Sequence, residues 1–529
     1  MARACLVVVV LLGAIYAWDG RKEHLGGDRI SYLDMADAIS HGRLAAAANA
    51  YWSPLYPAIV VGAFALRPSG YWEPIAVRFV DFLIFLAALA CFHFFWGPLV
   101  RRDPVWMIFG YAIFAWSSLQ LITMSVDSPD MLFSALVYLE FGILQRAIDD
   151  ESLPLYAASG FVLGAGYLAR SVMFPLAFVL LGIVLLRRRG FRHALVMFLG
   201  FVILAAPLAI ALSHSVGHVT FGEEGKITHV IFVQNADFTY TATGQPLIGP
   251  DTPVHPFRLL HAAPDVLDTG NYPGQVTYPT WYDPAHWYEG ARLHFQPRQE
   301  LGQFEAAWRP YVPILFSCGV LSAALIVLWL TGTTWRAPDW LTLLWSAAAL
   351  GAFAIVHVEP RLVAIYVALV WLWLYRGFFT ASLAQVHFAI LVVAIALLVP
   401  LVAEVPQMAF RAVRDVETHQ IASPDWETAT GLQRLGLQPG DRIAYIGDPI
   451  QADFARLARV TVSIRIPPRD VENFWELDTA DKNQVFSSML GAGAKAVVAE
   501  DIPPEERATW KRVGDTSVYI YPLAPGIAH

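Results

Sequence analysis

The sequence predicts a polytopic α-helical membrane protein with a large extracytoplasmic loop and a small C-terminal α/β domain. Of the 529 residues, 56% are hydrophobic and only 15% are charged, whereas soluble proteins carry about 25% charged residues. About eleven runs are apolar enough to form membrane helices, although the first of them is short. Residues 413–529 then return to a soluble composition. The net charge of −8 gives no reason to expect a nucleic-acid partner.

The predicted spans fall in two groups separated by one long loop. They are residues 4–18, 75–97, 105–124, 130–145, 154–169, 172–186, 193–212, 311–331, 339–357, 361–375 and 383–403. The first run also resembles a signal peptide, but we favour a retained helix because ten spans follow it. This gives a first module at 1–212 with an outer loop at 19–74, a loop at 213–310, further spans at 311–404 and the tail domain at 413–529.

Basic residues predict the orientation of these spans. Arg101, Arg102, Arg146, Arg336 and Arg376 all fall in short loops on one side of the predicted bundle. Short basic loops are typical of the cytoplasmic side. We therefore expect a cytoplasmic N-terminus and an extracytoplasmic C-terminal domain. Segments 19–74, 125–129, 213–310 and 358–360 would also lie outside.

The outer segments have predicted structure of their own. Residues 28–41 form a surface helix, and 57–66 are apolar but too short to cross a bilayer. The loop at 213–310 is far longer than a plain connection. In the tail, helices are expected at 426–435, 452–458 and 481–490, and strands at 442–447, 460–466, 494–499 and 517–523. This alternation favours a small α/β domain with a partly parallel sheet.

Ionisable side chains collect at one predicted level, near the outer membrane surface. Such groups are expensive at membrane depth and are functional candidates by default. Four separated segments supply them: Asp28, Asp127 with Asp130, Arg170, and His357, Glu359 and Arg361. Arginine binds phosphate through a planar fork of N–H groups, and a carboxylate can deprotonate a hydroxyl or hold a divalent metal. A lipid-linked phosphosugar suits this combination, while the need for a metal stays open.

A motif in the first outer loop points to a family. The run Gly27-Asp28-Arg29-Ile30-Ser31-Tyr32-Leu33-Asp34-Met35-Ala36, followed by Tyr51-Trp52-Ser53-Pro54-Leu55-Tyr56-Pro57, resembles the first outer loop of GT-C glycosyltransferases. The nearest branches are the protein O-mannosyltransferase-like and aminoarabinose-transferase-like ones, and the resemblance covers roughly residues 1–400. It implies that Asp28 is the catalytic aspartate. The sequence departs from the family where Arg29 follows Asp28 in place of a second acid, and where Leu362 follows Arg361 in place of tyrosine.

Further segments extend this resemblance. Ser125-Val126-Asp127-Ser128-Pro129-Asp130 resembles the second acidic site of the family, and Leu168-Ala169-Arg170 and Glu359-Pro360-Arg361 resemble its phosphate-contacting segments. The resemblance therefore implies that Arg170 and Arg361, with His357 and Glu359 beside them, bind the donor phosphate. Plainer roles stay open, because aspartates cap helices and favour helix N-termini. Arg170 could pair structurally, and Arg361 could pair with Glu359.

The 213–310 loop carries a concentration of aromatic and polar side chains. Aromatic rings can stack on sugars, and the neighbouring polar groups can bind hydroxyls. Interfacial aromatics also pack without binding anything, and that alternative stays open for each ring. The candidates for sugar or acceptor binding are Trp281, Tyr282, Asp283, Trp287 and Glu289 from this loop, and Tyr32, Tyr51 and Trp52 from the first loop.

Together these observations predict an inverting glycosyltransferase of a bacterial plasma membrane, with Asp28 as catalytic base and Asp127 or Asp130 assisting. The donor would be a polyprenyl-phosphate-linked sugar, and the acceptor an extracytoplasmic glycan, lipid or protein. A flippase or exporter of polyprenyl-linked saccharide is the alternative, yet the spans are mostly dry and show no repeat. A non-catalytic scaffold of envelope glycan assembly is the third hypothesis.

Overall fold

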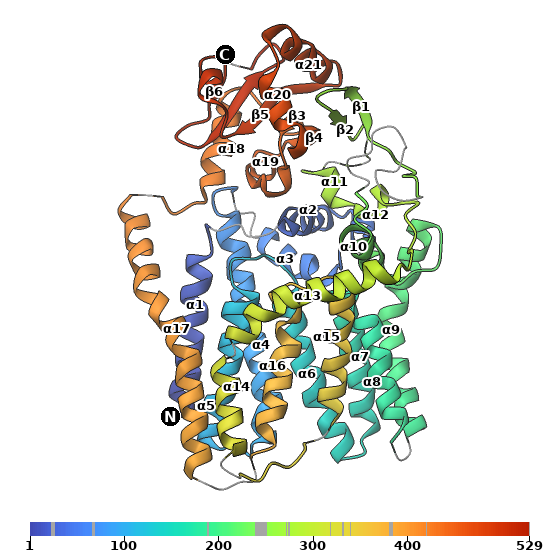
Figure 1. Ribbon diagram of the computed structural model, residues 1–529, viewed down its shortest axis with the longest axis vertical. Helices are drawn as coiled ribbons and strands as arrows, with labels where there is room; N and C mark the ends of the chain where they lie inside the picture. Colours follow the sequence, from blue (N-terminus) through green and yellow to red (C-terminus); the bar gives the residue numbers. More distant parts are fainter. Residues whose placement is uncertain are drawn as a thin grey trace.

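The protein is a helical bundle that carries a mixed α/β cap at one end (Figure 1). The computed structural model describes residues 1–529 except 23–26, 66–68, 188–189, 238–250, 271, 273, 275, 318, 331–332, 339, 380–383, 419 and 528–529. The end of the bundle next to the sheet is called the sheet end below. The first outer loop, the 213–310 loop and the tail all lie at this end, as the predicted topology requires (Figure 1).

Every predicted span except 311–331 falls on one continuous helical segment. The bundle contains α1 Ala2–Asp19, α4 Glu73–Leu99, α5 Pro104–Trp116 continued by η2 Ser117–Ile122, α6 Asp130–Asp149, α7 Leu153–Ala169, α8 Met173–Leu185, α9 Gly190–Val216, α14 Gly319–Leu330, α15 Trp340–Val356, α16 Pro360–Arg376 and α17 Ala384–Glu417. By length and composition, 6 helices of the described chain can cross a membrane, or up to 7 if a bent pair counts as one span. The protein is therefore a multi-pass membrane protein. The count of about eleven crossings and the orientation of the protein in the membrane stay predictions.

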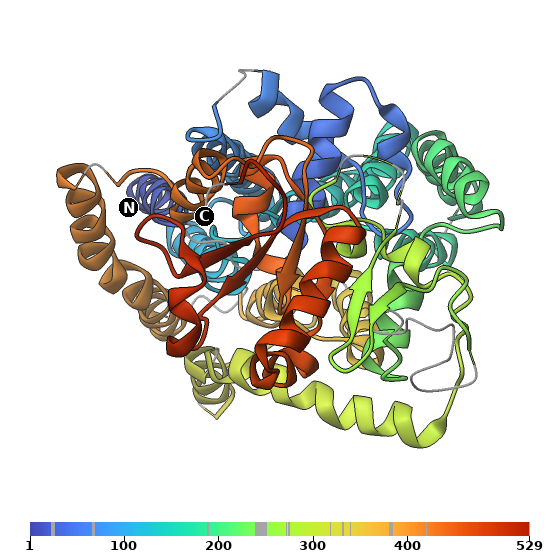
Figure 2. The same ribbon diagram turned by 90° about the horizontal axis from the view of Figure 1, so that it is seen from above.

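One predicted span is wrong in its bounds. Residues 311–331 read as a single apolar run, but α13 Pro297–Ser317 and α14 lie at 82° to one another. The first of these helices contains Pro310 and Pro313 and runs across the bundle, while α14 runs along it (Figures 1 and 2). An apolar run indicates burial in lipid or protein, not direction, so hydropathy does not detect the break.

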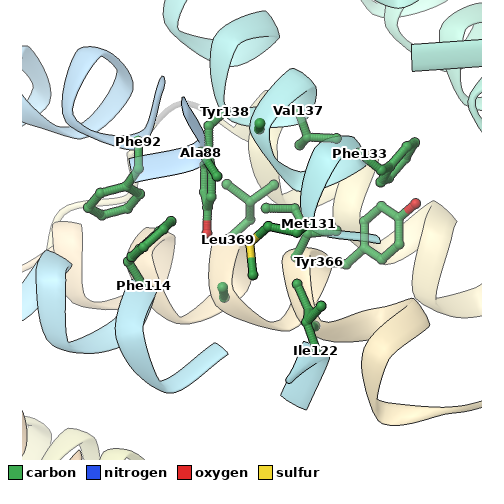
Figure 3. Packing of buried hydrophobic residues seen from close by; sticks show 14 of the residues in the cluster. Ala88, Phe92, Phe114, Ile122, Met131, Phe133, Val137, Tyr138, Tyr366 and Leu369 are labelled. Atoms are coloured by element: carbon green, nitrogen blue, oxygen red, sulfur yellow. The ribbon is translucent and has the colours of Figure 1, made fainter. Parts of the chain in front are cut away.

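The core of the bundle is aromatic and dry. Phe92, Phe114 and Tyr138 pack together where α4, α5 and α6 meet, with ring centroids 5.1–6.1 Å apart. Tyr366 and Leu369 of α16 face Met131 and Phe133 of α6 in the same layer (Figure 3). Some buried polar groups pair with one another, as between α7 and α6, where the Ser159 hydroxyl donates a short hydrogen bond to Glu140 Oε1. This packing fixes the starts of α6 and α16, where candidate site residues lie.

Short elements form the layer between the bundle and the sheet. They are α2 Asp28–Ser40, η1 Leu44–Ala48, α3 Leu55–Ala65, α10 Glu224–Phe232, α11 Pro279–Tyr282 and α12 Pro284–Trp287. Residues 28–41 were predicted as a helix, and α2 confirms it. Helix α2 lies across the bundle, between the long helices and the tail domain (Figure 1), and its first residue is Asp28.

The sheet has seven strands in the order β1-β2-β4-β3-β5-β7-β6. Strands β3 Arg442–Ile446, β4 Thr461–Ile466, β5 Ala494–Glu500 and β7 Val518–Pro522 match the predicted tail strands, and β3 runs parallel to both β4 and β5.

Helices α18 Pro424–Arg434, α19 Asp453–Ala458 and α21 Thr479–Gly491 match the predicted tail helices, while α20 Val471–Glu476 and β6 Lys511–Arg512 were not predicted. The long loop adds β1 Arg258–His261 and β2 Val266–Asp268, and β2 pairs with β4. The sheet thus joins two segments that the predicted domain boundaries separate.

Small residues let two helices approach closely. A Cβ added at Gly160 of α7 would lie 1.9 Å from the carbonyl oxygen of Met197 in α9, whereas one at Gly182 of α8 would meet nothing within 4 Å. We expect Gly160→Ala to push α7 and α9 apart, because backbone cannot yield as a flexible side chain can. The cost is about 1–3 kcal/mol, which should lower the Tm in detergent, while the matched Gly182→Ala should not. Equal Tm values for the two variants would contradict this close contact.

Candidate active site

A cavity of about 530 Å³ opens at the sheet end. Its wall comes from segments far apart in the sequence, and the chemistry-bearing members are Asp28, Tyr32, Tyr51, Trp52, Arg170, Ser171, Glu223, Glu224, Lys226, Thr228, Trp281, His357, Glu359 and Arg361. Apolar side chains of α8 and α15, including Val172, Pro175, Phe353 and Val356, line the rest. A wall that is mostly apolar with a few convergent polar groups is typical of a ligand site.

The Arg361 guanidinium joins three carboxylates. Its Nη2 lies 2.7 Å from Asp28 Oδ2, its Nη1 lies 3.4 Å from Asp130 Oδ2, and its Nε lies 2.7 Å from Glu359 Oε2. Arg361 and Asp28 are both largely buried, with side chains 18% and 17% exposed. The local ion pair of Arg361 with Glu359, which the sequence left open as an alternative, is present together with the two long-range contacts.

The start of α6 connects this group to the second arginine. Asp130 Oδ1 accepts a short hydrogen bond from Arg170 Nη1, and Asp130 Oδ2 accepts one from the Ser128 hydroxyl at 2.8 Å. Arg170 also lies 3.2 Å from Glu224 of α10. The two arginines therefore share Asp130, and both line the cavity.

Asp28 has no capping role in the described structure. It is the first residue of α2, and its carboxylate accepts from Arg361 and, at 3.4 Å, from the Trp281 indole N–H. Trp281 is itself fixed, because its carbonyl oxygen accepts from the Ser31 hydroxyl at 2.9 Å and from the Trp52 indole at 3.0 Å. The rings of Trp281 and Trp52 thus form an aromatic wall of the cavity beside the Asp28 carboxylate.

Tyr32 and Tyr51 complete that wall. The ring centroids of Tyr32 and Trp52 are 5.0 Å apart, and those of Tyr51 and Trp281 are 5.8 Å apart. These edge-on and tilted arrangements favour rigid packing, and all four rings line the cavity. Rings held in this way can contact a sugar without first becoming ordered.

Glu359 and His357, which precede α16, also line the cavity. His357 Nε2 lies 3.1 Å from Glu359 Oε1, and the His357 ring stacks on Phe232 of α10 at 3.8 Å between centroids. Burial alone would raise the pKa of Glu359. The hydrogen bond with His357 and the Arg361 charge outweigh burial and lower that pKa to about 2. Glu359 therefore stays ionised, and it pairs with Nε of Arg361 while Asp28 pairs with the neighbouring Nη2.

Asp127 lies outside the cavity, in contrast to the expectation that it assists the reaction. Its side chain is 1% exposed, and it pairs with Arg29 Nε at 2.6 Å and Arg78 Nη2 at 3.1 Å. Arg78 also lies 3.3 Å from Asp81. With its carboxylate enclosed by two arginines, Asp127 stabilises the junction of α2, α4 and α6.

Four loop residues lie away from the cavity as well. Trp287 is buried, and its indole donates to the Pro279 carbonyl at 2.9 Å. Asp283 accepts from the backbone of His286 and from the Tyr272 hydroxyl. Glu289 pairs with His255 at 2.8 Å, and the Tyr282 carbonyl accepts from Asn49. Packing and local pairing thus account for these side chains, and of the five loop candidates only Trp281 reaches the cavity.

The sequence analysis did not find Glu224, Lys226 and Phe232, which line the cavity from α10. They belong to an amphipathic stretch of the long loop, and no spacing signal ties them to Arg170 or His357. Among the described residues, no group of three or more His, Cys, Asp or Glu side chains is arranged to hold a metal ion.

The architecture matches two solved structures of ArnT from Cupriavidus metallidurans. The apo state gives a TM-score of 0.54 at 11% identity, and the state bound to undecaprenyl phosphate gives 0.51 at 12%. Both matches cover 100% of each chain. The chain shares the fold of ArnT. This agrees with the GT-C fold implied by the first-loop motif, although identity this low shows the fold alone. No protein-family model and no curated protein sequence matches the chain.

The lowered pKa of Glu359 predicts a dependence of stability on pH. Its pKa falls from 4.5 to about 2 on folding, so its contribution is complete above the unfolded value and disappears as pH drops through the folded one. We expect Glu359→Gln to lower the Tm at pH 7, and the difference from wild type to shrink below about pH 4.5. Glu472→Gln, on exposed α20, is the control and should leave the Tm unchanged. A difference that grows on acidification would contradict the assignment.

Proposed function

We propose that the protein is a glycosyltransferase of a bacterial inner membrane, which moves a sugar from a polyprenyl-phosphate donor to an extracytoplasmic acceptor with inversion. The observation that carries this proposal is the contact between Arg361 and Asp28 at the mouth of the cavity. It brings a phosphate-binding group and a general base together within 2.7 Å. Both residues belong to segments that resemble functional segments of GT-C enzymes.

The cavity wall supports a lipid-phosphate donor. Arg361 and Arg170 provide N–H groups for a phosphate, and Phe353, Val356 and Pro175 provide an apolar surface beside them. An isoprenoid chain suits that surface, since it can continue from the cavity into the bilayer. ArnT, whose fold this chain shares, has been solved with undecaprenyl phosphate, which supports the same class of donor.

The chemistry we propose is a single displacement. The acceptor hydroxyl oxygen attacks the anomeric carbon, the bond from that carbon to the phosphate oxygen breaks, and the hydroxyl proton passes to Asp28. Arg361 and Arg170 stabilise the charge that develops on the leaving phosphate. A donor phosphate also competes with Asp28 for Arg361, so its binding releases the Asp28 carboxylate to contact the acceptor hydroxyl. Trp281 and Tyr51 would flank the sugar.

Replacement of the base tests this assignment. We expect Asp28→Asn to lower kcat by at least about tenfold, because general-base catalysis contributes about 10²–10⁴. Asp481→Asn, the same substitution at an exposed position of α21, is the control and should keep near-normal turnover. The measurement is transfer of radiolabelled sugar from a polyprenyl-phosphate donor in detergent, where no sealed bilayer exists. Near-normal turnover by the Asp28 variant, at normal expression, would remove its proposed role.

Replacement of the arginine tests the donor site. A charge-assisted hydrogen bond is worth about 1.5–3 kcal/mol, so Arg361→Gln should weaken binding of the prenyl phosphate by at least about tenfold. Arg469→Gln removes an exposed arginine that pairs with Asp265 in the cap and should leave binding unchanged. Binding is measured on the purified protein with undecaprenyl phosphate. An equal affinity for wild type and the Arg361 variant would move the phosphate site elsewhere.

A further inference from the structure

The residues on both sides of Asp28 contact the C-terminal tail. A Cβ added at Gly27 would lie 2.1 Å from Cγ1 of Ile450 and 3.0 Å from its carbonyl oxygen. The Arg29 guanidinium lies 3.6 Å from Asp453 of α19. The start of α2, which carries Asp28, is therefore held between two residues of the tail.

The contact continues along α2 at a regular spacing. Arg456 Nη1 lies 2.6 Å from Asp34 Oδ1, and its Nη2 lies 3.0 Å from Glu73 at the start of α4. Every third tail residue from 450 to 459 contacts α2 or Gly27, the residue before it. Ile450 lies at Gly27, Asp453 at Arg29 and Arg456 at Asp34, and Arg459 pairs with Asp37 at the more exposed end. One side of the segment 450–459 is thus matched to α2.

Most of this interface is excluded from water. Arg29, Asp453 and Arg456 are 4%, 5% and 2% exposed. An ion left without its partner in such surroundings is strongly destabilising, so the tail and α2 cannot separate at low cost. Asp34 is held further by the backbone N–H of Thr277 at 2.6 Å. The position of α2 is consequently set by the tail as well as by the bundle.

The same tail reaches Asp28 from a second side. The backbone N–H of Val462 in β4 donates to the Thr277 carbonyl at 2.8 Å, and Arg465 of β4 donates to the Tyr278 hydroxyl at 2.6 Å. Three residues after Tyr278, Trp281 donates to Asp28. Strand β4 therefore fixes the run of loop that brings Trp281 to the carboxylate.

We propose that tail residues 450–465 are a positioning element for Asp28, with Asp453 and Arg456 as its buried positioning residues. This inference rests on the proposed function, in which Asp28 is the base. None of these tail residues lines the cavity, so they act on the reaction through α2 and Trp281. The C-terminal tail is then part of the catalytic apparatus, because the base reaches its place only when the tail is docked.

A reciprocal pair of substitutions tests the positioning. Gly27 has φ −69°, which alanine adopts freely, so Gly27→Ala acts through its clash with Ile450 alone. We expect Gly27→Ala to lower kcat at least about fivefold, with the KM for the donor changed less than about twofold, since only the base is displaced. Ile450→Ala in the same chain removes Cγ1 and should restore more than half of the lost kcat. Gly491→Ala, where an added Cβ meets nothing within 4 Å, is the matched control.

A second readout separates positioning from folding. Asp453→Asn keeps the side-chain volume and removes the charge, and we expect faster amide hydrogen exchange in 28–34 with unchanged exchange in α4–α6 and lowered kcat. Unchanged kcat in both Gly27→Ala and Asp453→Asn, with an active wild type, would overturn the inference. So would a parallel rise of the donor KM, or a double variant that loses more activity than Gly27→Ala. A wild type that transfers no sugar would instead overturn the proposed function.

Discussion

The site depends on one guanidinium that three carboxylates share. Arg361 is the second residue of α16, Asp28 is the first of α2 and Asp130 is the first of α6, while Glu359 directly precedes α16. Charges in poorly hydrated surroundings are tolerated only when they are paired. The starts of these helices must therefore meet at one level, and the aromatic core beneath them fixes their depth in the bundle.

The charged groups at the sheet end divide into two sets with different environments. The set around Asp127 is enclosed, with Arg29, Arg78 and Asp453 as partners, and it connects the bundle to the tail. The set around Arg361 borders the cavity, where its members can exchange partners with a ligand. Asp130, three residues from Asp127, is buried and does not line the cavity, but it belongs to this second set because it pairs with both Arg170 and Arg361. A shared fold does not by itself establish a function. The proposed function is therefore based on this second set of residues.

Much of the arrangement follows from the sequence, because hydropathy and basic loops determine which segments share an end of the bundle. Asp28, Asp130, Arg170 and Arg361 were predicted at one level from four separate segments, and the structure brings them into contact. The same pattern could not distinguish Asp127 from Asp130, since their partners are arginines far away in the chain. Arg78 lies inside a predicted apolar span, and Asp453 lies in the tail. Nor could apolar composition reveal the turn between α13 and α14, or the pairing of β2 with β4, which depends on contacts across some 200 residues.

The most direct measurement is an electron cryomicroscopy structure of the protein with added undecaprenyl phosphate. We expect density for the phosphate within hydrogen-bond distance of Arg361 and density for the isoprenoid chain along Phe353 and Val356. The Asp28 carboxylate should then point toward the head group. A lipid phosphate bound elsewhere, with Arg361 still held by Asp28, would contradict the account.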